Sequence, residues 1–180
     1  AIRDVEKLKA EIAKLTGAPI HWTDEGCVQY SQQFHEPVVM RAFAAWLEHR
    51  GDVEEFGKPP EDNYYKHPAW ALPKPDQRRF PTLVDHSLHN GYLLPVPFDG
   101  VHKVEPFMVH NHWKFYHFVA SSHSMLSEVT DFIALLSEYE ASRDPIEDGL
   151  PLKSIRWYAT ELQSMCGLSI EHQLPVVFHG

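Results

Sequence analysis

Residues 91–98, GYLLPVPF, and residues 107–119, FMVHNHWKFYHFV, decide the fold class of this chain. Both stretches are rich in aromatic and branched aliphatic side chains, which favour β-strands. Asp99-Gly100, a dipeptide typical of tight turns, stands between them. We therefore expect two strands joined through this turn, the second of them central in a sheet.

Apolar residues recur at helical spacing on both sides of the strand region. This periodicity predicts four helices, with proline in the first turn of two of them and glycine after their last turns. The helices are expected near residues 2–16, 36–50, 122–139 and 152–166, and a closing strand in LPVVFHG, residues 174–180. The predicted fold class is α+β, with about four helices packed on a small, mostly antiparallel sheet.

The first predicted helix has a narrow apolar stripe of Val5, Leu8, Ile12 and Leu15. Such a stripe favours a helix that lies on its own domain. The alternative is a homodimer contact through residues 2–16, because a stripe of this width resembles a coiled-coil seam.

Residues 51–80 differ from the rest of the chain because closely spaced prolines interrupt regular structure there. The segment also carries several aromatic side chains, which is unusual for a free linker. We expect an ordered loop laid across a single domain of residues 1–180. Long ordered loops are often functional.

The net charge of −9, from 16 Lys and Arg against 25 Asp and Glu, limits the partners that the chain can bind. Negative charge repels the nucleic acid backbone and anionic lipid, and it suits a basic protein partner. We therefore expect no nucleic-acid or membrane binding. The two cysteines, Cys27 and Cys166, have no CxxC spacing and indicate a reducing cytoplasm, with Cys166 as a buried structural residue.

A protein-binding surface is the first hypothesis for function. Acidic side chains steer association with a basic partner, and aromatic side chains supply most of the affinity at interfaces. The proline-rich segment combines both kinds. The candidate binding residues are Tyr64, Tyr65, Trp70, Glu54, Glu55 and Asp62.

A metal-dependent or histidine-based enzyme is the alternative, with zinc or another divalent metal as its cofactor. The candidate ligands are His86, His89, His110 and His112. On a regular strand His110 and His112 share one face, which supplies only two ligands where zinc needs three or four. No HExxH, GxSxG or phosphate-binding glycine motif occurs. The sequence therefore favours histidines that serve packing. It predicts no cofactor and identifies no catalytic residue.

Three stretches resemble motifs of small uncharacterised bacterial proteins. They are HSLHNGYLLPVPF, ASSHSMLSEV and SIRWYATELQSMCGLSIEHQLPVVFHG, and the likeness covers residues 83–180. Several bacterial families of this size and acidity look like immunity or antitoxin proteins. The resemblance implies a protein-binding role and supplies no catalytic residues. It also implies that Ser121-Ser122 end a strand and cap the next helix.

Overall fold

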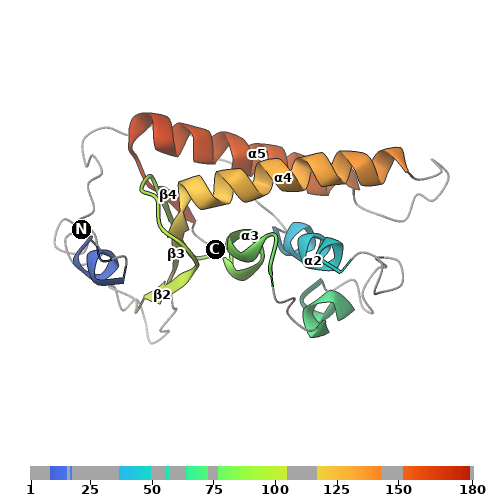
Figure 1. The fold of residues 1–180 in the computed structure, drawn as a ribbon, viewed down its shortest axis with the longest axis horizontal. Coiled ribbons are helices and arrows are strands. Elements are labelled where there is room, and N and C mark those ends of the chain that lie inside the picture. The colour runs from blue at the N-terminus through green and yellow to red at the C-terminus, as the bar shows by residue number, and fades with distance from the viewer. Residues whose placement is uncertain are drawn as a thin grey trace.

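The computed structural model describes residues 9–15, 17, 37–49, 56, 64–72, 77–104, 117–142 and 152–178. Long helices cover a small sheet at one end of the molecule (Figure 1). This arrangement confirms the α+β prediction. No described helix combines the length and the apolar character needed to cross a bilayer.

The sheet is mixed, with the strand order β2-β3-β1-β4. Its strands are β1 (Gly91–Leu94), β2 (His102–Val104), β3 (His117–Ser121) and β4 (Val176–Phe178). The two inner strands, β1 and β3, run parallel, and each outer strand is antiparallel to its neighbour. The prediction of a mostly antiparallel sheet with a closing strand after Pro175 is confirmed.

The two central stretches do pair, because β1 lies beside β3, but they run parallel and do not form a hairpin joined through the turn. The chain does turn at Gly100, where φ is 78°, but β1 and β2 do not pair because β3 lies between them. Pro95 and Pro97 lack an N–H group, so the first strand cannot extend its ladder beyond Leu94. β3 is an inner strand as expected, although residues 105–116, which hold most of the histidine-rich stretch, lie outside the described residues.

Three long helices enclose the main core: α2 (Pro37–Leu47), α4 (Ser122–Ala141) and α5 (Leu152–His172). α4 and α5 lie side by side and run in opposite directions (Figure 1). Their predicted apolar faces are buried, which confirms the helical periodicity. These faces consist of Met125, Val129, Phe132 and Leu136 on α4, and Ile155, Tyr158, Leu162 and Met165 on α5.

α5 continues past Gly167, where the sequence predicted its end. The buried Ser169 explains the extra turn, because its hydroxyl contacts the Ser122 hydroxyl at 2.7 Å and donates to the Leu174 carbonyl. The helix ends at Gln173, where φ is 55° and the Leu174 N–H bonds to the Ser169 carbonyl. Cys166 is buried as predicted, and burial raises the pKa of its thiol.

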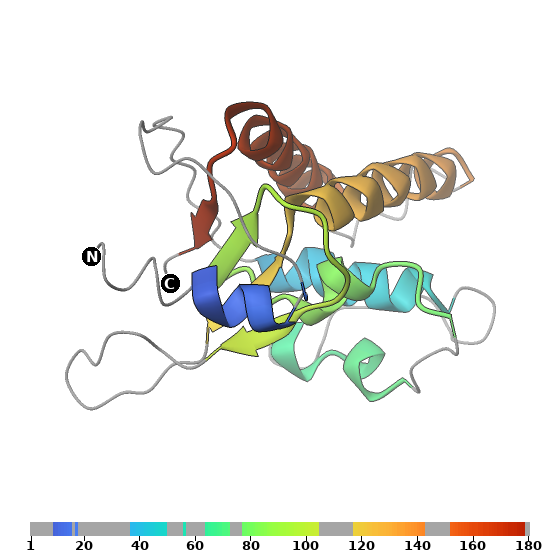
Figure 2. The same ribbon diagram turned by 60° about the vertical axis from the view of Figure 1, so that its left-hand side comes forward.

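Residues 9–15 form a helix that lies across one face of the sheet (Figure 2). Ile12, only 1% exposed, packs there with Leu94, Val104 and Val119. The first helix therefore lies on its own sheet, as the narrow stripe favoured. The homodimer through residues 2–16 stays a prediction.

The serines of the ASSHS motif fasten α4 to the loop after β1. The Ser121 hydroxyl donates to the Val96 carbonyl at 2.7 Å and accepts the N–H groups of His123 and Ser124 as the N-cap of α4. The Ser124 hydroxyl donates to the Phe98 carbonyl at 3.0 Å. The expectation that Ser121-Ser122 end a strand and cap a helix is confirmed.

The described parts of the proline-rich segment form short helical turns. They are η2 (Tyr64–Lys66) and η3 (Pro68–Ala71), and α3 (Pro81–Asp85) follows directly after the segment. None of the three was predicted, because each is too short for apolar periodicity to show. Tyr64 and Trp70 pack against the main core. The single domain and the ordered loop over residues 51–80 stay predictions.

Candidate functional site

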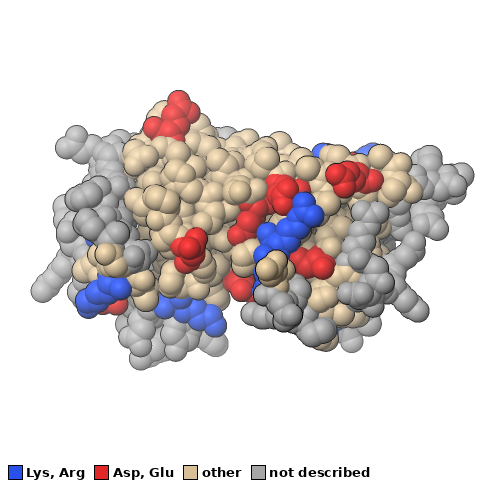
Figure 3. Space-filling view, viewed as in Figure 1, with Lys and Arg blue, Asp and Glu red and all other residues tan. Residues whose placement is uncertain are grey.

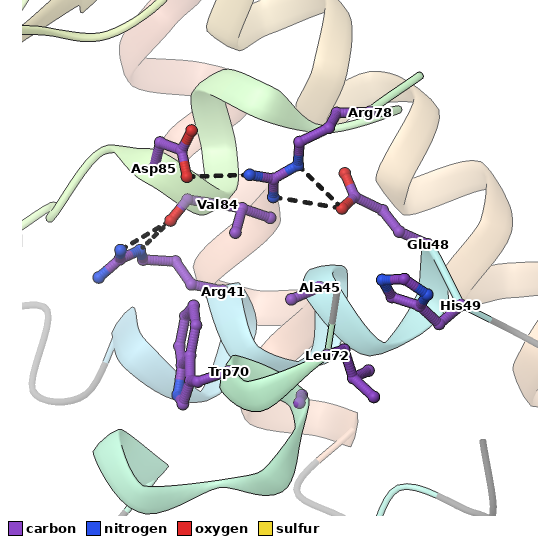
Figure 4. A pocket seen from close by; sticks show the side chains of 10 residues that line it. Arg41, Ala45, Glu48, His49, Trp70, Leu72, Arg78, Val84 and Asp85 are labelled. Carbon is purple, nitrogen blue, oxygen red and sulfur yellow. Dashed lines mark hydrogen bonds and ion pairs between the residues drawn. The ribbon is translucent and has the colours of Figure 1, made fainter. Parts of the chain in front are cut away.

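A pocket of about 230 Å³ lies between α2, α3 and η3 (Figure 4). Arg41 and Trp70 stand beside each other on one side of it, with the guanidinium carbon 5.3 Å from the indole ring centre. Arg78 lies on the other side, between Glu48 and Asp85. The pocket therefore joins two guanidinium groups, two carboxylates and an aromatic surface.

Arg78 is neutralised by both neighbouring carboxylates. Its guanidinium lies 3.2 Å from Glu48 Oε2 and 3.0 Å from Asp85 Oδ1. The other oxygen of Glu48 accepts the Phe80 N–H at 2.8 Å. The Glu48 side chain is only 2% exposed, so these contacts offset the free-energy cost of burying its charge.

The short helix α3 is held at both ends by charged side chains from longer helices. Glu128 of α4 accepts the N–H groups of Thr82 and Leu83 at 3.0 and 2.8 Å. Arg41 of α2 donates to the Val84 carbonyl at the opposite end. A carboxylate at the N-terminus and a guanidinium at the C-terminus both complement the helix dipole. Burial nevertheless raises the pKa of Glu128.

Replacing Glu128 with alanine is expected to lower the free energy of unfolding by about 1–2 kcal/mol, because the first N–H groups of α3 lose their acceptors. Glu138→Ala on the same helix is the matched control, since Glu138 is exposed. Its cost should stay within about 0.5 kcal/mol. Urea denaturation measures both, and equal losses would show that Glu128 contributes no more than a surface carboxylate.

The predicted binding aromatics come together on one side of the molecule, with different exposures. Tyr64 is half-buried and stacks on Phe56, and its carbonyl accepts the Trp70 indole N–H at 2.6 Å. Tyr65 is 59% exposed, and its hydroxyl hydrogen-bonds to His89 Nε2. Of the predicted aromatics, Tyr65 is therefore the one best placed to contact a partner.

The acidic members of the predicted binding set, Glu54, Glu55 and Asp62, lie outside the described residues. On the face drawn in Figure 3, some carboxylates sit beside basic side chains and others stand apart from them. Asp131 pairs with Arg79 at 2.8 Å, for example, and Glu140 pairs with Arg156. Most Asp and Glu residues of the chain belong to segments beyond the described ranges, so the sequence places the negative excess mainly there.

His86 is fully buried and bonded through both ring nitrogens. Nδ1 accepts the Leu88 N–H at 3.1 Å, so the proton resides on Nε2, which donates to the Phe118 carbonyl at 3.1 Å. Burial, opposed by the Phe118 bond and reinforced by the Arg41 charge, lowers the pKa of His86 to about 4. The lone pair of Nδ1 and the N–H of Nε2 thus both have protein partners, which suits a packing role.

The metal alternative remains a prediction. Within the described part of the chain, no group of three or more His, Cys, Asp or Glu residues could hold a metal ion. His86 and His89 have separate partners, and His110 and His112 are not among the described residues.

Sequence reasoning did not single out Arg41, Glu48 or Glu128. For Arg41 a signal existed, because it is the one polar residue in the eleven-residue helix PVVMRAFAAWL. A charged residue in an otherwise apolar helix needs buried partners. Glu48 and Glu128 looked like ordinary solvent-facing residues, and only their tertiary contacts distinguish them.

Comparison with known proteins identifies the family. The family model described as "Putative DNA-mimic protein" matches residues 18–178. No curated protein and no solved structure matches the chain. The match extends far beyond the likeness noted for residues 83–180 and names a different class from immunity or antitoxin proteins, while agreeing with a protein-binding role. Because it covers most of the sequence, the chain belongs to this DNA-mimic family.

Proposed function

We propose that this chain occupies the DNA-binding surface of a basic protein and so competes with DNA for it. The family match over residues 18–178 carries the proposal. A DNA mimic presents negative charge to the surface with which a DNA-binding protein contacts phosphates. The net charge of −9 is consistent with that role. The same charge explains why the chain itself should not bind nucleic acid.

We further propose that the contact surface includes Tyr65 and the acidic residues that precede it in the sequence. Tyr65 is 59% exposed, and Asp62 is three positions before it. Glu54 and Glu55 contribute further charge in the same proline-rich segment. Exposed tyrosine supplies contact area, and carboxylates steer the encounter and set its salt dependence.

Reciprocal competition tests the function. A protein captured by the tagged chain is purified and mixed with labelled duplex DNA, and the untagged chain is then titrated in. Displacement of the DNA, with an affinity for the chain that falls as salt rises, is expected. A captured protein that binds the chain and DNA simultaneously, or that has no affinity for DNA, would contradict the proposal.

A matched pair of triple variants tests the location. The first replaces Glu54, Glu55 and Asp62 with their amides, and the second does the same to Asp99, Glu138 and Glu171, which are exposed on the described surface. Both remove three negative charges. We expect the first to weaken partner binding about 10-fold or more and the second by less than about 3-fold. Equal losses would show that net charge alone matters.

A further inference from the structure

Arg41 differs from every other described arginine. Arg78, Arg79 and Arg156 each bind a carboxylate. Among the described residues, the partly buried Arg41 donates only to backbone carbonyls: Val84 O at 2.7 and 3.1 Å, and Ser87 O at 3.3 Å. Among the described residues, no carboxylate forms an ion pair with this sheltered cation, although Asp85 acts on it electrostatically.

The hydrogen bonds of Arg41 leave part of its guanidinium unused. A guanidinium has five N–H groups, and the bonds to Val84 and Ser87 occupy three of them. The others have no acceptor among the described residues. Trp70 covers one face of the group, so a further partner has to approach along its edge. This is the geometry in which arginine binds oxyanions.

Arg41 is the cation of the pocket that forms no ion pair among the described residues. At the opposite side, Arg78 contacts the carboxylates of Glu48 and Asp85, which together carry one charge more than Arg78 (Figure 4). Burial lowers the pKa of both His86 and His89, and the nearby Arg41 charge lowers it further. Tyr65 and Asp85 are the acidic groups that act on Arg41 in return.

We propose that Arg41 and the pocket beside it bind a small oxyanion with phosphate or carboxylate chemistry. The volume of about 230 Å³ accommodates a group of a few heavy atoms. A sheltered cation gains most from a partner that replaces lost hydration, and a bidentate oxyanion does so with good geometry. The site lies near Tyr65 of the proposed partner surface, because Tyr65 acts electrostatically on Arg41.

Titration with inorganic phosphate and, separately, sodium acetate tests the site, with sodium chloride holding the ionic strength constant. NMR follows the Arg41 Nε–H signal and the ring signals of His89. We expect saturable shifts of the Arg41 signal and a rise in the pKa of His89, because a bound anion offsets the Arg41 charge. The anion with the lower dissociation constant identifies the preferred chemistry. Shifts that never saturate, or that chloride reproduces, would overturn the proposal.

Arg41→Lys and Arg79→Lys form a matched pair for the same titration. Lysine keeps the charge but loses the planar fork. We expect Arg41→Lys to weaken binding about 10-fold or more, while Arg79→Lys, altered at an exposed ion pair, leaves it unchanged. Equal effects of the two substitutions would refute the assignment. If Arg41→Lys does not fold, the Arg41 Nε–H signal of the wild type still tests the assignment, because an anion bound elsewhere would not shift that signal.

Discussion

Replacing Gly91 with alanine is expected to lower the free energy of unfolding by roughly 4 kcal/mol or more. Gly91 begins β1 with a φ of 148°, a conformation that side chains rarely adopt. An added Cβ would overlap the Phe118 carbonyl oxygen and lie 2.9 Å from the Phe118 backbone nitrogen. These are backbone atoms of the neighbouring strand, so the clash cannot be relieved by a rotamer change.

Gly100→Ala is the control for this substitution. Gly100 also has a positive φ, 78°, but a Cβ there would meet nothing within 4 Å. Its loss should be limited to the backbone strain of about 1–2 kcal/mol. Thermal and urea unfolding of both variants measure the difference. A Gly91→Ala loss no larger than that of Gly100→Ala would mean that β1 and β3 are not packed as closely as described.

Lowering the pH from 7 to 4 is expected to remove about 3 kcal/mol of stability through His86 alone. The pKa of this imidazole falls from 6.5 to about 4 in the folded chain, chiefly because burial disfavours the charged form. The unfolded chain binds a proton below about pH 6.5 and the folded chain does not. The contribution of His86 is therefore complete above pH 6.5 and is lost as the pH falls towards 4.

His86→Gln isolates this contribution, because glutamine keeps an N–H donor and does not titrate in this range. Urea unfolding of both proteins at several pH values should show the wild type losing about 3 kcal/mol more than the variant between pH 7 and 4. The two proteins have to be compared because Glu128 affects stability in the opposite direction. Its raised pKa stabilises the folded state as the pH falls. Parallel stability curves would show that His86 is not neutral and buried.

The family match agrees with the protein-binding role that charge suggested, whereas the metal site that the histidines suggested stays a prediction. Acidity is a property of composition, and it needs no fold to favour a basic protein partner. A metal site requires several side chains to converge within bonding distance, which spacing along one strand cannot establish. Both ring nitrogens of His86 instead form hydrogen bonds with backbone groups.

The sequence by itself determined the fold class and the long helices, and it favoured a protein-binding role, because apolar periodicity and net charge are read without knowing which segments meet. The buried faces of α4 and α5 were predicted residue by residue for this reason. Strand order, the extension of α5 to His172 and the partners of Arg41 and Glu128 depended on the tertiary structure. Each of these depends on contacts between residues distant in the chain, and local propensity carries no information about such contacts.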